Sequence, residues 1–282
     1  MEFSVREPEA RATPLVVEVP HAGLHVDATA LSTLLAPANA LGRDADLYVD
    51  ELFQDAPSEG AALLTSHVSR YVVDLNRAEN DFDALAVENG SARVSPHGLI
   101  WRTTTEGRSA LLGPLPRSEV ERRLDTYYRP YHAALRRLLD ARVASFGYAI
   151  LLCAHSMPSR GRDGHQDIGR ERADIVPGSR GRSSAAAPII DTVDRVAREA
   201  GFSVAHDQPY RGGFSTGHYG RPDQGVHAVQ VELNRKLYMN ELSLEKKPNE
   251  FARMVAFCRR LTRELSELSP RAAAAPRDAA RV

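Results

Sequence analysis

The chain contains short apolar runs with the length of β-strands, separated by longer segments that have helical spacing. The clearest runs cover residues 15–19, 61–65 and 148–153, and each is too short for a stable helix. Further along, apolar side chains recur every three or four positions at 189–200 and 249–266, which is typical of helices with one buried face. Strands that alternate with helices predict a single α/β domain, with a mostly parallel or mixed sheet flanked by helices.

The remaining elements are predicted from weaker local signals. Residues 71–75 and 202–205 have the composition of strands. Residues 44–56 have roughly helical spacing, and Asp44 is the expected N-cap.

A capping-box pattern at Ser118 predicts the start of a long helix, which Pro130 kinks or splits. Segments 80–116 and 157–187 have no regular pattern. We interpret 80–116 as a long functional or lid-like segment and 157–187 as a second long loop. The Gly-rich segment 211–220 is predicted to be a flexible loop able to close over a ligand. It lacks the Lys-Ser/Thr ending of a phosphate-binding P-loop.

The charges nearly cancel, with 36 Lys and Arg against 37 Asp and Glu, so nothing in the composition favours nucleic acid or an anionic membrane as partner. The N-terminus has no apolar signal-peptide core, and no run of about 18 apolar residues occurs. Cys153 and Cys258 lie in apolar runs and are expected to be buried thiols of a reducing compartment. We therefore expect a soluble, cytoplasmic protein with one domain at 1–266 and a disordered tail at 267–282.

Residues 229–234 alternate strictly between apolar and polar side chains, in the order Val-Gln-Val-Glu-Leu-Asn. A strand with this pattern has one apolar and one polar face. A carboxylate in the middle of a buried strand costs free energy unless a metal, a cation or a reaction compensates for it. We therefore expect Glu232 to face an active site.

Polar residues also follow other predicted strands: His21, the pair Asn76-Arg77, and His155. In open α/β sheets, ligands bind at the carboxyl ends of the strands. A single histidine there is more often a hydrogen-bonded loop residue than a ligand. Two histidines with one carboxylate and a water, however, form the ligand set of a hydrolytic zinc site. In such a site Glu232 fits the role of general base, and the imidazoles need acceptors behind them.

Asp44 or Asp50 is the expected acceptor that orients these imidazoles. Arg70, with Asn76 and Arg77, indicates an anionic substrate, because a guanidinium binds a carboxylate through two parallel hydrogen bonds. A serine-hydrolase mechanism at Ser156 is the weaker alternative, since the sequence around it lacks the GxSxG elbow.

The order of these clusters resembles the N-formylglutamate amidohydrolase family. The similarity spans residues 15–241, and its most specific blocks are DLNR and QVELNRxLYMNE. The other matching blocks are VEVPHAG, RDADLYVDELF, AHSMPS, DIVPG and PYRGGFSTGHYG. The resemblance implies a phosphorylase/hydrolase-like fold related to zinc carboxypeptidases. It also implies hydrolysis of N-formyl-L-glutamate to formate and L-glutamate, a step of histidine degradation.

The resemblance further implies that His21 and His155 are metal ligands, with Asp46 as the third ligand and Asp44 as the alternative. One Zn²⁺ is the expected ion, although another divalent metal is an alternative. Glu232 would be the general base. Arg70 would bind the substrate carboxylate or polarise the formyl oxygen, and is the second expected catalytic residue. Substrate contacts are expected from Arg70, Asn76, Arg77, Arg211 and Gly213.

Two other functions stay open at this point. The arginine-rich segment 157–186 departs from the family pattern, which allows a deacylase or carboxypeptidase-like hydrolase of another N-acyl amino acid or small peptide. A non-catalytic protein that binds an acidic metabolite is the alternative from another class. In each case the partner is a small acidic molecule, and the sequence does not indicate an oligomeric state.

Overall fold

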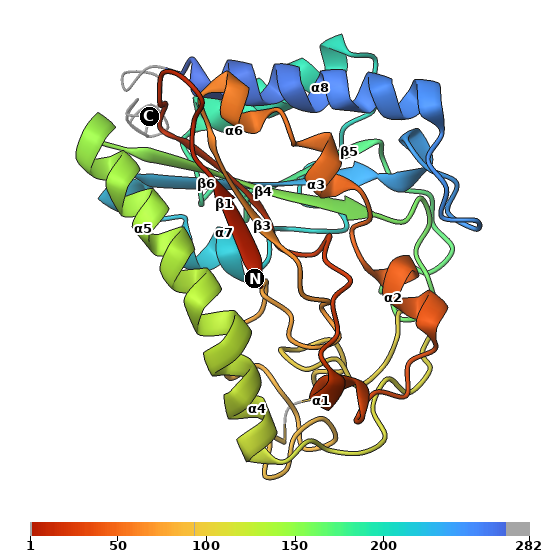
Figure 1. Ribbon diagram of the computed structural model, residues 1–282. Helices are drawn as coiled ribbons and strands as arrows, with labels where there is room; N and C mark the ends of the chain where they lie inside the picture. The colour runs from red at the N-terminus through yellow and green to blue at the C-terminus, as the bar shows by residue number, and fades with distance from the viewer. Residues whose placement is uncertain (1, 93, 269–282) are drawn as a thin grey trace, which may run out of the picture.

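Six strands form one mixed sheet in this computed structural model, which describes residues 2–92 and 94–268 (Figure 1). The strand order is β1-β3-β2-β4-β6-β5. The central neighbours β3, β2, β4 and β6 are parallel, and both edge strands are antiparallel to their neighbours. The strands are β1 (Phe3–Arg6), β2 (Leu15–Val19), β3 (Ala62–Ser66), β4 (Ala149–Met157), β5 (Ile175–Gly178) and β6 (Val226–Asn234). The predicted class, a single α/β domain with a mostly parallel sheet, is confirmed.

Helices cover both faces of this sheet (Figure 1). One layer contains α3 (Val49–Leu52), α6 (Ala187–Glu199) and α8 (Pro248–Ser266). The other layer contains α4 (Arg117–Arg123), α5 (Arg129–Phe146), α7 (Phe214–Tyr219) and the irregular segment 80–116. The short helices are α1 (Ala28–Leu31), α2 (Ala38–Asp44), the π-turn Leu124–Tyr128, and the 3₁₀ turns Ala56–Glu59, Pro222–Gln224 and Arg235–Leu237. None of the helices in the described part of the chain is long and apolar enough to cross a membrane.

The side chains of β4 alternate between two hydrophobic cores. Ile150 and Leu152 point into the core under α6 and α8, and Leu151 and Cys153 point into the core under α5. Such a strand, buried on both faces, has the continuous apolar sequence expected at the centre of a parallel sheet. Both cysteines are buried free thiols, as predicted, and Cys258 lies on α8.

Strand β6 confirms the predicted alternation. Val229 and Val231 pack into the core beneath α6 and α8, and Gln230 and Glu232 point to the opposite face. Because β4 and β5 pair with β6 on both sides, Glu232 is only 5% exposed although it is ionisable.

The predicted strand at 71–75 is wrong. This segment forms successive turns, in which Val72 and Val73 donate their backbone N–H groups to the Ser69 carbonyl. Its apolar side chains are buried in the core beneath segment 80–116 rather than in the sheet, and a buried turn has the same composition as a strand.

Other strand predictions also need correction. Segment 202–205 forms only one bridge, between Val204 and Ile175, instead of a strand. Conversely, the predicted loop 157–187 contains β5, whose Pro177 and Gly178 weaken the strand signal and are tolerated at a sheet edge. The N-terminal edge strand β1 was not predicted either.

Three helix predictions were wrong in detail. Within the range 44–56, expected to be one helix, only α3 is an α-helix. Tyr48, directly before α3, has a left-handed backbone with φ 68°, and Asp44 ends α2 instead of capping a helix. Pro116, not Ser118, precedes the first residue of α4. The Gly-rich loop 211–220 contains α7.

Pro130 does not split the helix, which continues from α4 through the π-turn into α5. It lies in the first turn of α5, directly after the π-turn that connects α4 to α5. A π-turn changes the hydrogen-bond register, so the helix can accommodate a residue without an N–H group. The tail predicted to be disordered is 267–282. Its residues 269–282 lie outside the described part of the chain.

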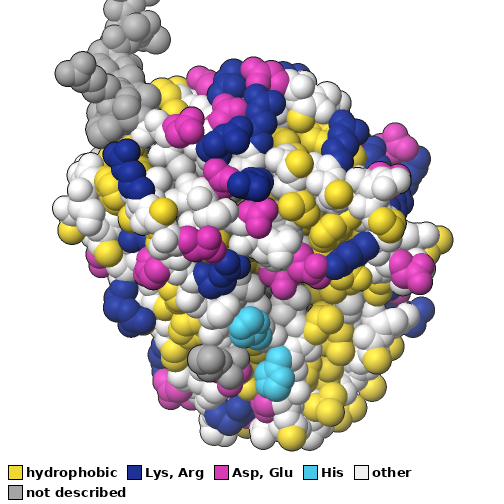
Figure 2. All heavy atoms as spheres, turned by 45° about the horizontal axis from the view of Figure 1, so that its top comes forward, with side chains coloured by type: hydrophobic (Ala, Val, Ile, Leu, Met, Phe, Trp, Pro, Cys, Tyr) yellow, Lys and Arg dark blue, Asp and Glu magenta, His cyan; other side chains and the backbone are white. Residues whose placement is uncertain are grey.

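Acidic and basic side chains are interspersed on the face shown in Figure 2. Across the contact of α6 with α8, Arg195 pairs with Glu264 and Arg260 pairs with Glu199. Exposed ion pairs of this kind contribute little to stability, so the buried apolar faces of the two helices hold them on the sheet.

Candidate active site

A cavity of about 270 Å³ lies at the carboxyl ends of β2, β4 and β6. His21 follows β2, His155 is in the last part of β4, and Glu232 is in β6. Strand pairing places His155 directly opposite Glu232. The polar residues predicted from strand ends therefore meet at one edge of the sheet, as expected for an open α/β fold.

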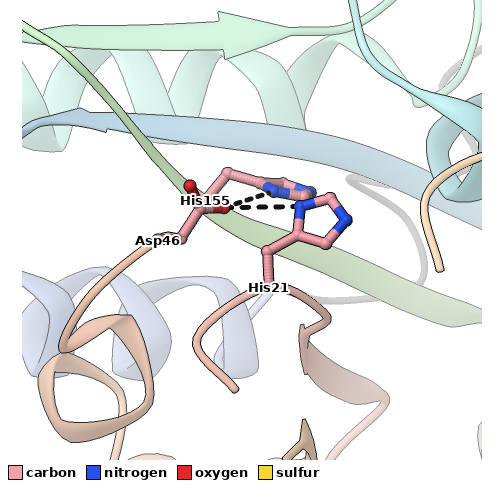
Figure 3. A group of neighbouring side chains, drawn as sticks. All are labelled: His21, Asp46 and His155. Carbon is pink, nitrogen blue, oxygen red and sulfur yellow. Dashed lines mark hydrogen bonds and ion pairs between the residues drawn. The ribbon is translucent and has the colours of Figure 1, made fainter. Parts of the chain in front are cut away.

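His21, Asp46 and His155 form a buried cluster on the wall of this cavity (Figure 3). One ligand atom from each side chain lies within 4.8 Å of the others. Asp46 Oδ2 lies 2.9 Å from His155 Nδ1 and 3.5 Å from His21 Nδ1. Asp46 comes from the connection between α2 and α3, so three separate segments converge on this point. Asp44, the alternative ligand, does not belong to the cluster.

The other ring nitrogen of His21 fixes the orientation of the imidazole. His21 Nε2 lies 2.7 Å from Asp74 Oδ1, while His21 Nδ1 is buried and has no hydrogen-bond partner in the described part of the chain. A carboxylate behind an imidazole, with the other nitrogen left available, is typical of histidine ligands to metals. Two imidazoles and one carboxylate suit a divalent ion such as zinc. The residues present therefore fit a metal.

The carboxylates of this cluster are held in their charged form. Burial by itself would raise the pKa of Asp46, but the 2.9 Å hydrogen bond with His155 and the charges of His155 and His21 hold it well below its usual range. Burial also opposes the charge of Asp74, and the nearby His21 and Arg70 reverse the effect and lower its pKa well below the usual range. Both carboxylates are available as acceptors at neutral pH.

Glu232 has the opposite shift. Burial raises its pKa above the usual range, although the nearby His155 lowers it in part. Gln230 Nε2 donates a 2.7 Å hydrogen bond to Glu232 Oε1. Glu232 is thus a buried carboxylate with an elevated pKa that lines the cavity beside the histidine cluster.

Asp74, which the sequence reasoning missed, connects the histidine cluster to Arg70. Its Oδ1 accepts from His21 and from the Asn76 backbone N–H, and its Oδ2 accepts from Arg70 and from Trp101 Nε1. Trp101 also stacks beneath the Arg70 guanidinium at 4.2 Å. The signal for Asp74 was a lone carboxylate in the apolar run 71–75, the same kind of signal that identified Glu232.

Asp44 and Asp50 do not orient the imidazoles, contrary to the prediction. Asp44 accepts hydrogen bonds from Tyr71 Oη at 2.5 Å and from the Thr105 backbone at 3.1 Å, and it pairs with Arg162. These contacts join segments 80–116 and 157–187, which both contribute to the cavity wall. Thr105 and Arg162 had no sequence signal, because they occupy segments without periodicity.

The side-chain amide of Asn76 is held within the protein. Its Oδ1 accepts from the Ser215 backbone N–H at 2.9 Å, and its Nδ2 lies 3.2 Å from His155 Nε2. Gly213 packs directly against this amide, where a Cβ would approach Asn76 Nδ2 to 2.3 Å, and its N–H donates to Gln230. Gly213 therefore allows the first turn of α7 to contact Asn76.

Ser156 has no histidine partner of the kind a nucleophilic serine needs. Its hydroxyl accepts from Arg235 Nε at 3.0 Å and lies 3.5 Å from Asp46 Oδ1. Arg235 also donates to Asp46 at 3.1 Å. Ser156 and Arg235 thus support the Asp46 carboxylate from behind, and sequence reasoning missed Arg235.

Six arginines line the cavity, and they differ in whether the protein already uses their charge. Four form ion pairs: Arg43 with Glu106, Arg70 with Asp74, Arg162 with Asp44, and Arg235 with Asp46. The guanidinium groups of Arg77 and Arg211 form no ion pair or hydrogen bond with any residue in the ranges 2–92 and 94–268. Both were predicted substrate contacts, and both are free to bind an anion.

The fold and the site define the class of protein: a single-domain α/β protein with a buried His-Asp-His candidate metal centre and an adjacent carboxylate. Comparison with known proteins narrows this class. Residues 13–239 match the family model described as N-formylglutamate amidohydrolase. This chain belongs to the N-formylglutamate amidohydrolase family.

Individual relatives agree with this assignment. N-formylglutamate deformylases from Pseudomonas putida and Pseudomonas aeruginosa are 35% and 34% identical over 231 residues, covering 81% of this chain and 82% and 83% of theirs. A crystal structure of N-formylglutamate amidohydrolase from Ralstonia eutropha JMP134 superimposes with a TM-score of 0.86 at 31% identity, covering 94% of this chain and 97% of that one. Gene product Atu2144 from Agrobacterium tumefaciens shares the fold, with a TM-score of 0.68 at 19% identity and 94% of each chain covered.

Proposed function

We propose that this protein hydrolyses N-formyl-L-glutamate, adding water across the formamide C–N bond to release formate and L-glutamate. The observation that carries this proposal is the buried His21, Asp46 and His155 cluster beside Glu232, in a chain of the N-formylglutamate amidohydrolase family. Two of its relatives are N-formylglutamate deformylases, and the match to them includes most of both chains.

We infer that the cluster holds one zinc ion. One supporting observation is the buried Nδ1 of His21, which has no hydrogen bond to any described residue and lies 3.5 Å from Asp46 Oδ2. The other is the donor set of two imidazoles and one carboxylate. A zinc ion held there would supply Lewis-acid activation of water and of the formyl carbonyl. The protein's own residues then have to move the protons and hold the substrate.

Glu232 is the proposed general base. Its carboxylate would accept a proton from the attacking water and deliver that proton to the nitrogen of the departing glutamate. Burial raises its pKa towards the working pH, which suits a group that must both accept and release a proton. Gln230 fixes one carboxylate oxygen through its 2.7 Å hydrogen bond and so limits rotation of the base.

Arg70 and Arg77 have different proposed roles. An ion pair with Asp74 holds the Arg70 guanidinium in place, and the Arg70 side chain is 15% exposed. Arg70 is therefore suited to donate a hydrogen bond to the formyl oxygen as negative charge develops there. Arg77 has an unpaired guanidinium and follows Asn76, so we assign it to the α-carboxylate of the substrate. The side-chain amide of Asn76 already forms hydrogen bonds within the protein. We propose that its main role is to hold the segment of Asn76 and Arg77 against His155.

The test combines metal analysis with the Glu232→Gln variant. We expect about one zinc per chain in both proteins and a roughly 10²- to 10⁴-fold lower kcat for formate release in the variant, because the base is lost while the ligands remain. Glu250→Gln, an exposed position on α8, is the matched control and should leave kcat unchanged. A metal-free protein with full activity, or an unaffected Glu232→Gln rate, would refute the mechanism. Turnover of N-acetyl- and N-succinyl-glutamate in place of the formyl substrate would refute the proposed acyl specificity.

A further inference from the structure

Arg211 differs from the other cavity arginines in how the protein holds it. Its backbone carbonyl accepts a 2.8 Å hydrogen bond from the Arg180 N–H, and the next carbonyl, of Gly212, accepts from Arg180 Nη1 at 3.1 Å. Gly212 has φ +100°, a conformation that a residue with a side chain adopts only with strain. The backbone of Arg211 is therefore fixed while its guanidinium has no partner among the residues described.

The loop opposite Arg211 is fixed as well. Asp207 accepts from the backbone N–H groups of Ser179 and Gly181, at 2.7 and 2.6 Å. Gly178, the last residue of β5, packs so closely on this loop that a Cβ there would lie 2.7 Å from the Gly212 nitrogen. An anion-binding side chain on a rigid support loses less conformational entropy when it binds than one on a flexible loop.

Arg211 enters the cavity from a different part of the sheet than Arg77 does. Its loop packs on β5, which is two strands away from β4 and hence roughly 10 Å from the strand that carries His155. Arg77, in contrast, directly follows Asn76, whose Nδ2 lies 3.2 Å from His155 Nε2. The two free guanidinium groups thus belong to segments that lie at different distances from the strand of His155.

We propose that Arg211 selects the side-chain carboxylate of the substrate's amino-acid half. This inference rests on the proposed function. A substrate with two carboxylates presents one close to the scissile bond and a second, two methylene groups further away. The near carboxylate matches Arg77 and the distant one matches Arg211. Arg211 is thereby a specificity-determining residue for acidic over neutral N-formyl amino acids.

The test compares N-formyl-L-glutamate with N-formyl-L-glutamine, which has the same shape and lacks the distal charge. For Arg211→Gln we expect kcat/KM on formylglutamate to fall roughly 10- to 100-fold, mainly through KM, because a charge-assisted contact is lost. The kcat/KM on formylglutamine should stay within about twofold of wild type, because that substrate makes no ion pair with Arg211. Arg211→Lys keeps the charge and should recover part of the preference.

Arg137→Gln provides the matched control, since Arg137 is an exposed arginine of α5 that does not line the cavity. It should keep the wild-type preference. An Arg211→Gln protein that is folded by circular dichroism and still prefers formylglutamate by the wild-type ratio overturns the assignment of Arg211 alone. A wild-type protein that hydrolyses neither substrate overturns the proposed function instead, so the two failures are distinguishable.

Discussion

Replacing Asp74 by asparagine tests whether one carboxylate holds both His21, a candidate metal ligand, and Arg70. Asp74 is fully buried, and each of its oxygens serves a different group of donors. Oδ1 accepts from His21 Nε2 at 2.7 Å and from the Asn76 N–H at 2.9 Å. Oδ2 accepts from Arg70 Nη2 at 2.8 Å and from Trp101 Nε1 at 2.9 Å.

Asparagine cannot satisfy this arrangement in either orientation of its amide. Whichever oxygen is replaced, the new NH₂ group faces at least two hydrogen-bond donors and has no acceptor to donate to. We expect metal affinity and kcat to fall by about 10- to 100-fold each, the usual effect of losing the group behind a metal-binding imidazole. The metal-free protein should also lose about 3–5 kcal/mol of unfolding free energy, because Arg70 loses its buried partner.

The assay is a chelator-competition titration for metal affinity, followed by kinetics at saturating metal and urea unfolding of the metal-free protein. Asp50→Asn is the control, since Asp50 is a partly buried carboxylate on α3 that contacts neither imidazole of the cluster. An Asp74→Asn protein with wild-type metal affinity and rate would refute the coupling between His21 and Arg70 argued above. Equal losses in Asp50→Asn would show that any nearby carboxylate has the same effect.

Two further changes test the supporting structure. Gly213→Ala places a Cβ 2.3 Å from Asn76 Nδ2, so the buried amide of Asn76 has to shift. We expect kcat/KM to fall by about tenfold or more and the melting temperature to fall as well; wild-type kinetics would contradict this packing argument. For Asp44, burial opposes the charge, but hydrogen bonds from Thr105 and Tyr71 lower the pKa. Its stabilising effect is thus present above the unfolded-state pKa of about 4 and is lost as pH falls through the lower folded value. The difference in unfolding free energy between wild type and Asp44→Asn should therefore shrink in urea titrations below about pH 4, and a pH-independent difference would contradict the assignment.

The central sheet and the long helices could be predicted from sequence because their signals are local. Strand β4 is a continuous apolar run, and α8 repeats its apolar residues at helical spacing. Glu232 and the two histidines could be found for a related reason. A polar side chain inside or directly after a buried strand costs free energy, so its presence there indicates a function.

The errors occur where tertiary contacts decide the local structure. Residues 71–75 are as apolar as a strand, but the turn at Ser69 directs them into the core beneath segment 80–116. Strand β5 has weak strand composition and exists because the edge of β6 offers it hydrogen bonds. Asp74 was missed with its segment, since a residue assigned to a strand interior was not considered as the partner of an imidazole.

The four buried carboxylates that line the cavity differ in whether an arginine neutralises their charge. Of the four buried carboxylates that line it, Asp44, Asp46 and Asp74 each have an arginine within 3.1 Å. Glu232 has a hydrogen bond from a neutral amide and no ion pair with any described residue. Burying a carboxylate without a cation is costly, which is why the pKa of Glu232 is raised. A cation held at the neighbouring histidine cluster would offset that cost, so the proposed base and the candidate metal ligands are parts of one electrostatic arrangement.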